Sequence, residues 1–158
     1  MNVALREVTP KNFKECVNLK VADTQASFVA SNVMSLAYSR FYPTVTPMAV
    51  YAGDEMVGFV LFGLDPDDDR YYLIRLMIDE RHQGRGYGKA AVERVIEKML
   101  ENPECRELYL SFVPENTGAE ALYKSVGFER TGEIAEGEIV MRYDMTKEAN
   151  NGRPRADN

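Results

Sequence analysis

The stretch Gln83-Gly84-Arg85-Gly86-Tyr87-Gly88-Lys89 stands between an apolar run and a helical pattern. The run from Tyr71 to Ile78 has only Arg75 as a polar interruption, which is typical of a fully buried strand. After the glycines, apolar residues fall on one face of a helix, namely Val92, Val95, Ile96, Met99 and Leu100. The glycines therefore lie at a helix N-terminus, where free backbone N–H groups and the helix dipole favour a phosphate. We interpret the stretch as a pyrophosphate cradle between a strand and a helix.

Two familiar phosphate-binding motifs do not fit this loop. A nucleotide P-loop requires Gly where Gln83 stands and Ser or Thr where Ala90 stands. A dinucleotide fingerprint requires Gly-x-Gly-x-x-Gly, whereas Gly84, Gly86 and Gly88 are spaced Gly-x-Gly-x-Gly. The pattern that remains is Gln-x-x-Gly-x-Gly, for which a surface turn without a ligand is the alternative interpretation.

Length and composition indicate one globular domain. The chain has 158 residues, of which 45% are apolar, and we expect the domain to span residues 1–146. Residues 147–158 have almost nothing to bury, so we expect a disordered tail there. No apolar run reaches the ~20 residues of a membrane span, and the N-terminus lacks a signal pattern. We therefore expect a cytoplasmic protein with no membrane partner.

Charge and cysteine usage exclude further classes. The net charge of −6 argues against nucleic acid as a partner and favours a small cationic substrate. Cys16 and Cys105 show neither CxxC nor metal-ligand spacing. We expect both to be small core residues and neither to form a disulfide or a metal site.

The remaining patterns predict an α/β (α+β) protein. Thr117-x-x-Glu120 is a capping-box candidate for the last helix, and Gly127 is placed to end it. The expected order is a strand near residues 3–8, a helix from Pro10, a helix over 31–40, a hairpin of strands 48–51 and 56–64, the buried strand, the cradle helix, a strand over 107–113, the last helix, and a hairpin of 129–134 and 139–144.

This element order and two motifs resemble the GNAT acetyltransferase superfamily. Gln83-x-x-Gly86-x-Gly88 matches its acyl-CoA loop, which is Gln or Arg, two residues, Gly, one residue, and Gly or Ala. The stretch from Asn116 to Phe128 resembles its Asn, then Ala, then Leu-Tyr-x-x-x-Gly-Phe signature. The resemblance runs from about Val3 to Asp144. It implies the GNAT fold, with a central mixed, mostly antiparallel twisted sheet of about seven strands flanked by about four helices.

The resemblance also implies acetyl-CoA as co-substrate, without a metal. Backbone groups of Leu76, Met77 and Ile78 resemble those that pair with pantetheine and polarise the thioester carbonyl. Asn116 would help to hold the pantetheine arm, and Lys124 would add positive charge. The cofactor-binding residues implied in this way are completed by Gln83, Gly84, Arg85, Gly86, Tyr87, Gly88, Lys89, Thr117, Gly118 and Ala119.

Tyr123 is the candidate catalytic acid. The family places the matching Tyr near the thioester sulfur, and a phenol with a reference pKa of ~10 can protonate a thiolate whose thiol has a pKa of ~8.5. The alternative is a core aromatic on the apolar stripe of a helix. His82 is a second acid-base candidate, but its loop position beside Arg81 predicts an exposed side chain instead.

Within the superfamily, the segments 28–32 and 77–81 look most like bacterial spermine/spermidine, or diamine, N-acetyltransferases. This resemblance implies acetyl transfer from acetyl-CoA to a primary amine of spermidine or spermine, by direct attack through a tetrahedral intermediate. Asp23 and Asp65 are the substrate-binding candidates. Vertebrate polyamine enzymes carry paired carboxylates where this chain has Ile74 and Arg75. The polyamine site is therefore expected to be built differently.

Other functions remain open. An acetyltransferase of this fold could accept a protein N-terminus, an amino acid or an aminoglycoside, and a CoA-binding regulator without catalytic activity is an alternative of another class. A homodimer also remains open.

Overall fold

The apolar run forms β4 (Tyr71–Ile78), the central strand of a seven-stranded sheet with the order β1-β2-β3-β4-β5-β7-β6. The computed structural model describes residues 2–147, so all of the predicted tail except Lys147 lies outside the described residues. Neighbouring strands are antiparallel, apart from the parallel pair β4 and β5. The other strands are β1 (Ala4–Glu7), β2 (Val45–Ala52), β3 (Glu55–Leu64), β5 (Glu107–Phe112), β6 (Glu129–Ala135) and β7 (Glu138–Asp144).

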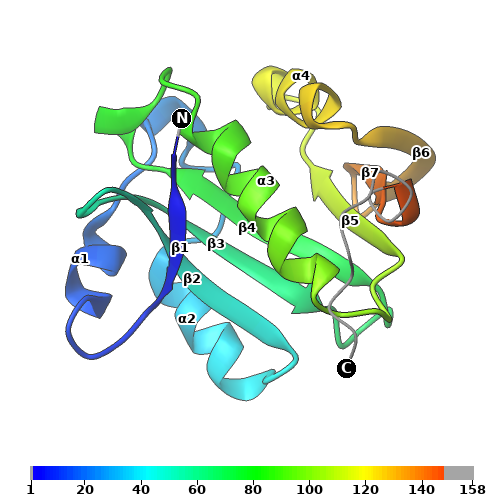
Figure 1. The fold of residues 1–158 in the computed structure, drawn as a ribbon. Coiled ribbons are helices and arrows are strands. Elements are labelled where there is room, and N and C mark those ends of the chain that lie inside the picture. The colour runs from blue at the N-terminus through cyan, green and yellow to red at the C-terminus, as the bar shows by residue number, and fades with distance from the viewer. Residues whose placement is uncertain (1, 148–158) are drawn as a thin grey trace.

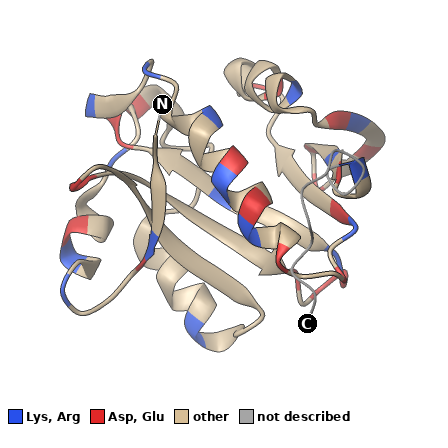
Figure 2. Ribbon diagram, in the orientation of Figure 1, with Lys and Arg blue, Asp and Glu red and all other residues tan. Residues whose placement is uncertain are grey.

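Helices cover both faces of the sheet (Figure 1). On one face, α3 (Tyr87–Leu100) and α4 (Thr117–Val126) enclose the larger apolar core. On the other, α1 (Phe13–Asn18) and α2 (Asn32–Phe41) enclose a smaller core. Charged residues of both signs occur along α3, whereas β2 has none (Figure 2). No helix in the described range is both long and apolar enough to cross a bilayer.

The sheet opens between β4 and β5. These strands pair at Tyr72 and Tyr109, while β4 stays paired with β3 as far as Ile78. The pairing register between β3 and β4 also shifts by one residue, because Leu61 pairs with Arg75 and Phe62 pairs with Leu73. Ile74 is therefore left without a partner on β3 and forms a β-bulge. A bulge bends its strand. The carboxyl-terminal half of β4 therefore borders a gap rather than a neighbouring strand.

The predicted fold class is confirmed, and so is the burial of both cysteines as free thiols. Several local details differ. Helix α1 begins at Phe13, not at Pro10, because the Asn12 amide first closes a turn by accepting a 2.7 Å hydrogen bond from the Thr9 N–H. The structure also contains two unpredicted short 3-10 helices, η1 (Asp23–Gln25) and η2 (Glu80–His82).

The predicted capping box is wrong. The N-cap of α4 is Asn116, and no side chain caps this helix end. Glu120 instead accepts a 2.8 Å hydrogen bond from Arg130 at the start of β6. This tertiary ion pair replaces the local bond that the spacing suggested.

Candidate functional site

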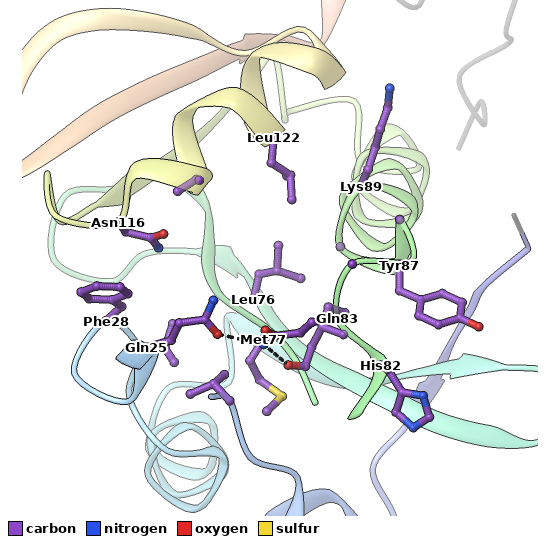
Figure 3. Close-up of a pocket in the computed structure, with 18 of the residues that line it drawn as sticks. Gln25, Phe28, Leu76, Met77, His82, Gln83, Tyr87, Lys89, Asn116 and Leu122 are labelled. Atoms are coloured by element: carbon purple, nitrogen blue, oxygen red, sulfur yellow. Dashed lines mark hydrogen bonds between the residues drawn. The ribbon is translucent and has the colours of Figure 1, made fainter. Parts of the chain in front are cut away.

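Two cavities meet at the gap between β4 and β5. The first, which we call the cradle cavity, has a volume of about 390 Å³ and lies between the end of β4, the start of α3 and the start of α4 (Figure 3). The second, the bulge cavity, has a volume of about 430 Å³ and lies beside the β4 bulge and the start of β7. The residues that line both cavities are Phe28, Val29, Leu76, Asn116 and Tyr123.

At the start of α3, the wall of the cradle cavity includes three glycines, Gly84, Gly86 and Gly88. Gly86 is the N-cap with φ of +83°, and the helix begins with a 3.2 Å hydrogen bond from the Ala90 N–H to the Gly86 carbonyl. The N–H groups of residues 87–89 therefore have no partner within the helix. A Cβ placed on Gly84, where φ is +76°, would meet no atom within 4 Å. Unpaired donors, the positive end of the helix dipole and free space together suit an anion.

Asp79 fixes the turn that leads from β4 into this loop. Its carboxylate accepts hydrogen bonds from the N–H groups of Lys20 (3.0 Å) and Arg81 (3.1 Å) and from Arg81 Nε (2.7 Å). Burial alone would raise the pKa of this carboxyl, but these hydrogen bonds outweigh burial and lower it. Asp79 is therefore ionised at neutral pH, and it ties the cradle to Lys20 in the segment that follows α1.

Gln83, the first residue of the loop motif, turns inward. Its Nε2 donates to the Ile78 carbonyl (2.9 Å) and to Gln25 Oε1 (2.8 Å), as the dashed lines in Figure 3 show. Gln25 lies in η1, between α1 and α2. This amide therefore links three parts of the site: the end of β4, the cradle and the α1–α2 segment.

Tyr123 lies where the two cavities meet. Its ring is half-buried and packs 6.1 Å from the ring of Phe112 and 5.9 Å from that of Phe128, measured between centroids. Burial raises the pKa of the phenol to about 12, because the phenolate would lose its hydration. Tyr123 thus keeps its proton at neutral pH. Its packing matches the core interpretation, and its place at the cavities matches the catalytic one.

The prediction of an exposed His82 is wrong. The side chain is buried, its Nε2 lies 3.2 Å from Glu55 Oε1, and its ring packs edge-on to Tyr87. The short helix η2 turns the imidazole inward against the start of β3, a contact that the local sequence does not encode. His82 also lines the cradle cavity.

The structure brings most of the predicted cofactor residues together around the cradle cavity. Those that line it are Leu76, Met77, Ile78, Gln83, Gly84, Gly86, Tyr87, Gly88, Lys89, Asn116, Gly118 and Ala119. Arg85 and Thr117 are not among the lining residues, and Lys124 instead pairs with Glu120 at 3.2 Å.

The predicted substrate carboxylates do not reach either cavity. Asp23 lies exposed in η1, and Asp65 accepts a hydrogen bond from the Asp67 N–H within the turn after β3. The α1–α2 segment supplies other lining residues that the sequence analysis did not single out, among them Gln25 and Phe28. The sequence signal for Phe28 was the similarity of segment 28–32 to polyamine acetyltransferases, whereas Gln25 lies before that segment and had none.

Comparison with known proteins adds independent evidence. The acetyltransferase (GNAT) family model matches residues 13–128. The spermine/spermidine N(1)-acetyltransferase of Bacillus subtilis (strain 168) is 33% identical over 148 residues, which cover 89% of this chain and 97% of that protein. The chain belongs to the GNAT acetyltransferase family. This result confirms the predicted family and the predicted class of enzyme.

Solved structures share the fold of this GNAT acetyltransferase. Spermidine N-acetyltransferase from Vibrio cholerae, in complex with CoA and spermine, superposes with a TM-score of 0.74 at 19% identity, covering 94% of this chain and 98% of that one. An aminoglycoside acetyltransferase in complex with coenzyme A gives a TM-score of 0.78 at 17% identity, covering 94% and 99%. One fold thus carries acetyltransferases with different acceptors, so the acceptor must be argued from the site.

Proposed function

We propose that this GNAT acetyltransferase transfers the acetyl group of acetyl-CoA to a primary amine of a polyamine such as spermidine or spermine. The observation that carries the proposal is the meeting of two cavities at Leu76, Asn116 and Tyr123. One cavity suits an anionic cofactor, and the other leaves room for an acceptor. The relationship to the Bacillus subtilis enzyme supports the choice of a polyamine.

The residues of the cradle cavity fit acetyl-CoA. The N–H groups at the start of α3, together with Gly84 and Gly86, would hold the pyrophosphate. Leu76 and Met77 lie in the part of β4 that is not paired with β5. The backbone groups along this open edge of β4 are therefore available to pantetheine. Bound acetyl-CoA supplies the activated acetyl thioester, and Asn116 lies beside its proposed path.

Tyr123 would donate a proton to the departing thiolate. With a pKa raised to about 12, the phenol is protonated across the physiological range, as a proton donor must be. The attacking amine must be neutral, although alkylamines have a reference pKa near ~10.4. We therefore expect the rate at low amine concentration to rise with pH. Tyr123 would not limit this rise until the pH approaches its own pKa.

An amino acid is the second candidate acceptor. The observation in its favour concerns Arg75, which lines the bulge cavity. In the described part of the chain, the buried Nε of Arg75 has no hydrogen-bond partner. A guanidinium pairs well with a carboxylate.

Thiol release from acetyl-CoA, measured across a panel of amines, tests the proposal. The panel contains spermidine, spermine, butylamine, amino acids and an aminoglycoside. We expect the highest kcat/KM for spermidine or spermine. A preference for an amino acid would support the second candidate instead, and thiol release that no amine accelerates would contradict both.

A further inference from the structure

The bulge cavity is lined by one positively and one negatively charged residue. Among its described lining residues, only Arg75 and Glu138 are charged. The walls between them include the aromatic residues Phe28 and Phe112 and the hydroxyl-bearing residues Ser27 and Ser111. Such a cavity can hold a methylene chain along its apolar walls, and its charged groups decide which polar groups that chain can carry.

Strand alternation places Glu138 on the face of the sheet where the acceptor would lie. On β7, Ile139, Met141 and Tyr143 belong to the apolar core under α3 and α4, so Glu138 projects to the opposite face. Ile139 pairs with Phe112 at the last position of β5. Glu138 therefore stands next to the end of β5, where the sheet has opened.

The Glu138 carboxylate is available to a ligand. It is partly buried, and within residues 2–147 its side chain forms neither a hydrogen bond nor an ion pair. Glu133 on the neighbouring strand β6 is engaged, because it pairs with Arg70 at 2.9 Å. A partly buried carboxylate without a protein partner is a favourable site for an ammonium group.

Arg75 makes the bulge cavity electrostatically asymmetric. Its Nη1 donates to the Ile74 carbonyl at the bulge (2.8 Å), which anchors the guanidinium close to β4. A cationic arm is repelled from Arg75 and attracted to Glu138. The electrostatically favoured path for this arm therefore leads from the junction at Tyr123 towards β7.

We infer that Glu138 binds the second ammonium group of the acceptor and thereby makes the enzyme prefer polyamines to monoamines. This inference rests on the proposed function and supplies the carboxylate that Asp23 and Asp65 do not provide. Glu138 acts here as a specificity-determining residue, while the chemistry takes place at the junction of the two cavities.

The test compares Glu138→Gln with Glu136→Gln, a matched control in the adjacent β6–β7 turn whose exposed side chain does not line the cavity. The quantity compared is the ratio of kcat/KM for spermidine to kcat/KM for butylamine. We expect Glu138→Gln to lower this ratio about tenfold, mainly through the spermidine KM, because an ion-paired hydrogen bond to the ammonium becomes one to a neutral amide oxygen. Acetyl-CoA affinity and the control should be unchanged.

Three further measurements sharpen the test. Glu138→Asp keeps the charge and should recover part of the spermidine preference. The increase of the spermidine KM with salt should be smaller in Glu138→Gln than in the wild type, because one screened attraction is absent. Thermal unfolding establishes that each variant is folded.

Different failures have different meanings. A wild type that acetylates no polyamine refutes the proposed function and this inference together. A wild type that acetylates spermidine, with a selectivity ratio unchanged by Glu138→Gln, refutes only the inference. Equal losses for spermidine and butylamine, or a lower kcat with an unchanged KM, would likewise overturn the assignment of Glu138 to the second ammonium.

Discussion

Replacing Gly86 with Asp places a negative charge where we expect the pyrophosphate of acetyl-CoA. Gly86 is the N-cap of α3, next to the unpaired N–H groups of residues 87–89. At a separation of ~5 Å, each phosphate charge would repel the new carboxylate by about 1 to 3 kcal/mol. Two such charges correspond to a loss of affinity of at least about 30-fold.

The control is Gly86→Asn, which has nearly the same size and no charge. Gly86 has φ of +83°, a region that costs residues with a Cβ about 1 to 2 kcal/mol and that Asn and Asp tolerate best. Both variants should therefore lose similar stability, and only the Asp variant should suffer the electrostatic loss. Calorimetric titration with acetyl-CoA measures the difference, which should shrink at high salt. Equal affinity of the two folded variants would refute the cradle.

Tyr123→Phe should lower kcat by about 100-fold or more with little change in acetyl-CoA affinity, because it removes only the proposed proton donor; wild-type turnover would mean that Tyr123 serves only in packing. Gln25→Ala should lower kcat/KM about threefold by removing one hydrogen bond of Gln83, whereas an unchanged value would mean that the bond does not position the site. Asp79→Asn should lower the free energy of unfolding by about 2 kcal/mol at pH 7, mainly through the two backbone N–H donors, since Arg81 is exposed. Because folding lowers the pKa of Asp79, its stabilising contribution should be fully present at pH values above its unfolded pKa of ~3.9 and should disappear as the pH falls through its folded pKa. A difference in unfolding free energy between wild type and variant that does not change with pH would contradict this prediction.

The strand, loop and helix around the cradle could be predicted because their signals are local. Each of these three segments carries the pattern that predicts its own structure: the apolar run of β4, the glycines of the loop and the helical periodicity of α3. The start of α1 could not be placed, since the Thr9–Asn12 turn depends on a side-chain bond that competes with the helix signal of Pro10.

The acceptor side of the site could not be predicted because its contacts join distant segments. The burial of His82 depends on Glu55, and the orientation of Gln83 depends on Gln25. Glu138 reaches the cavity only because β7 lies beside β5 in the sheet. Neither the hydrophobic periodicity of β7 nor a sequence motif predicts that β7 pairs with β5. The acidic residues proposed from sequence instead lie in turns and in a short helix.

A competition assay tests the central claim most directly. The enzyme is incubated with acetyl-CoA and equal concentrations of spermidine, aspartate, an aminoglycoside and a peptide with a free N-terminus, and mass spectrometry identifies the acetylated product. We predict that spermidine gains one acetyl group well before the other acceptors react. Acetylation of aspartate, the aminoglycoside or the peptide in place of spermidine would contradict the account.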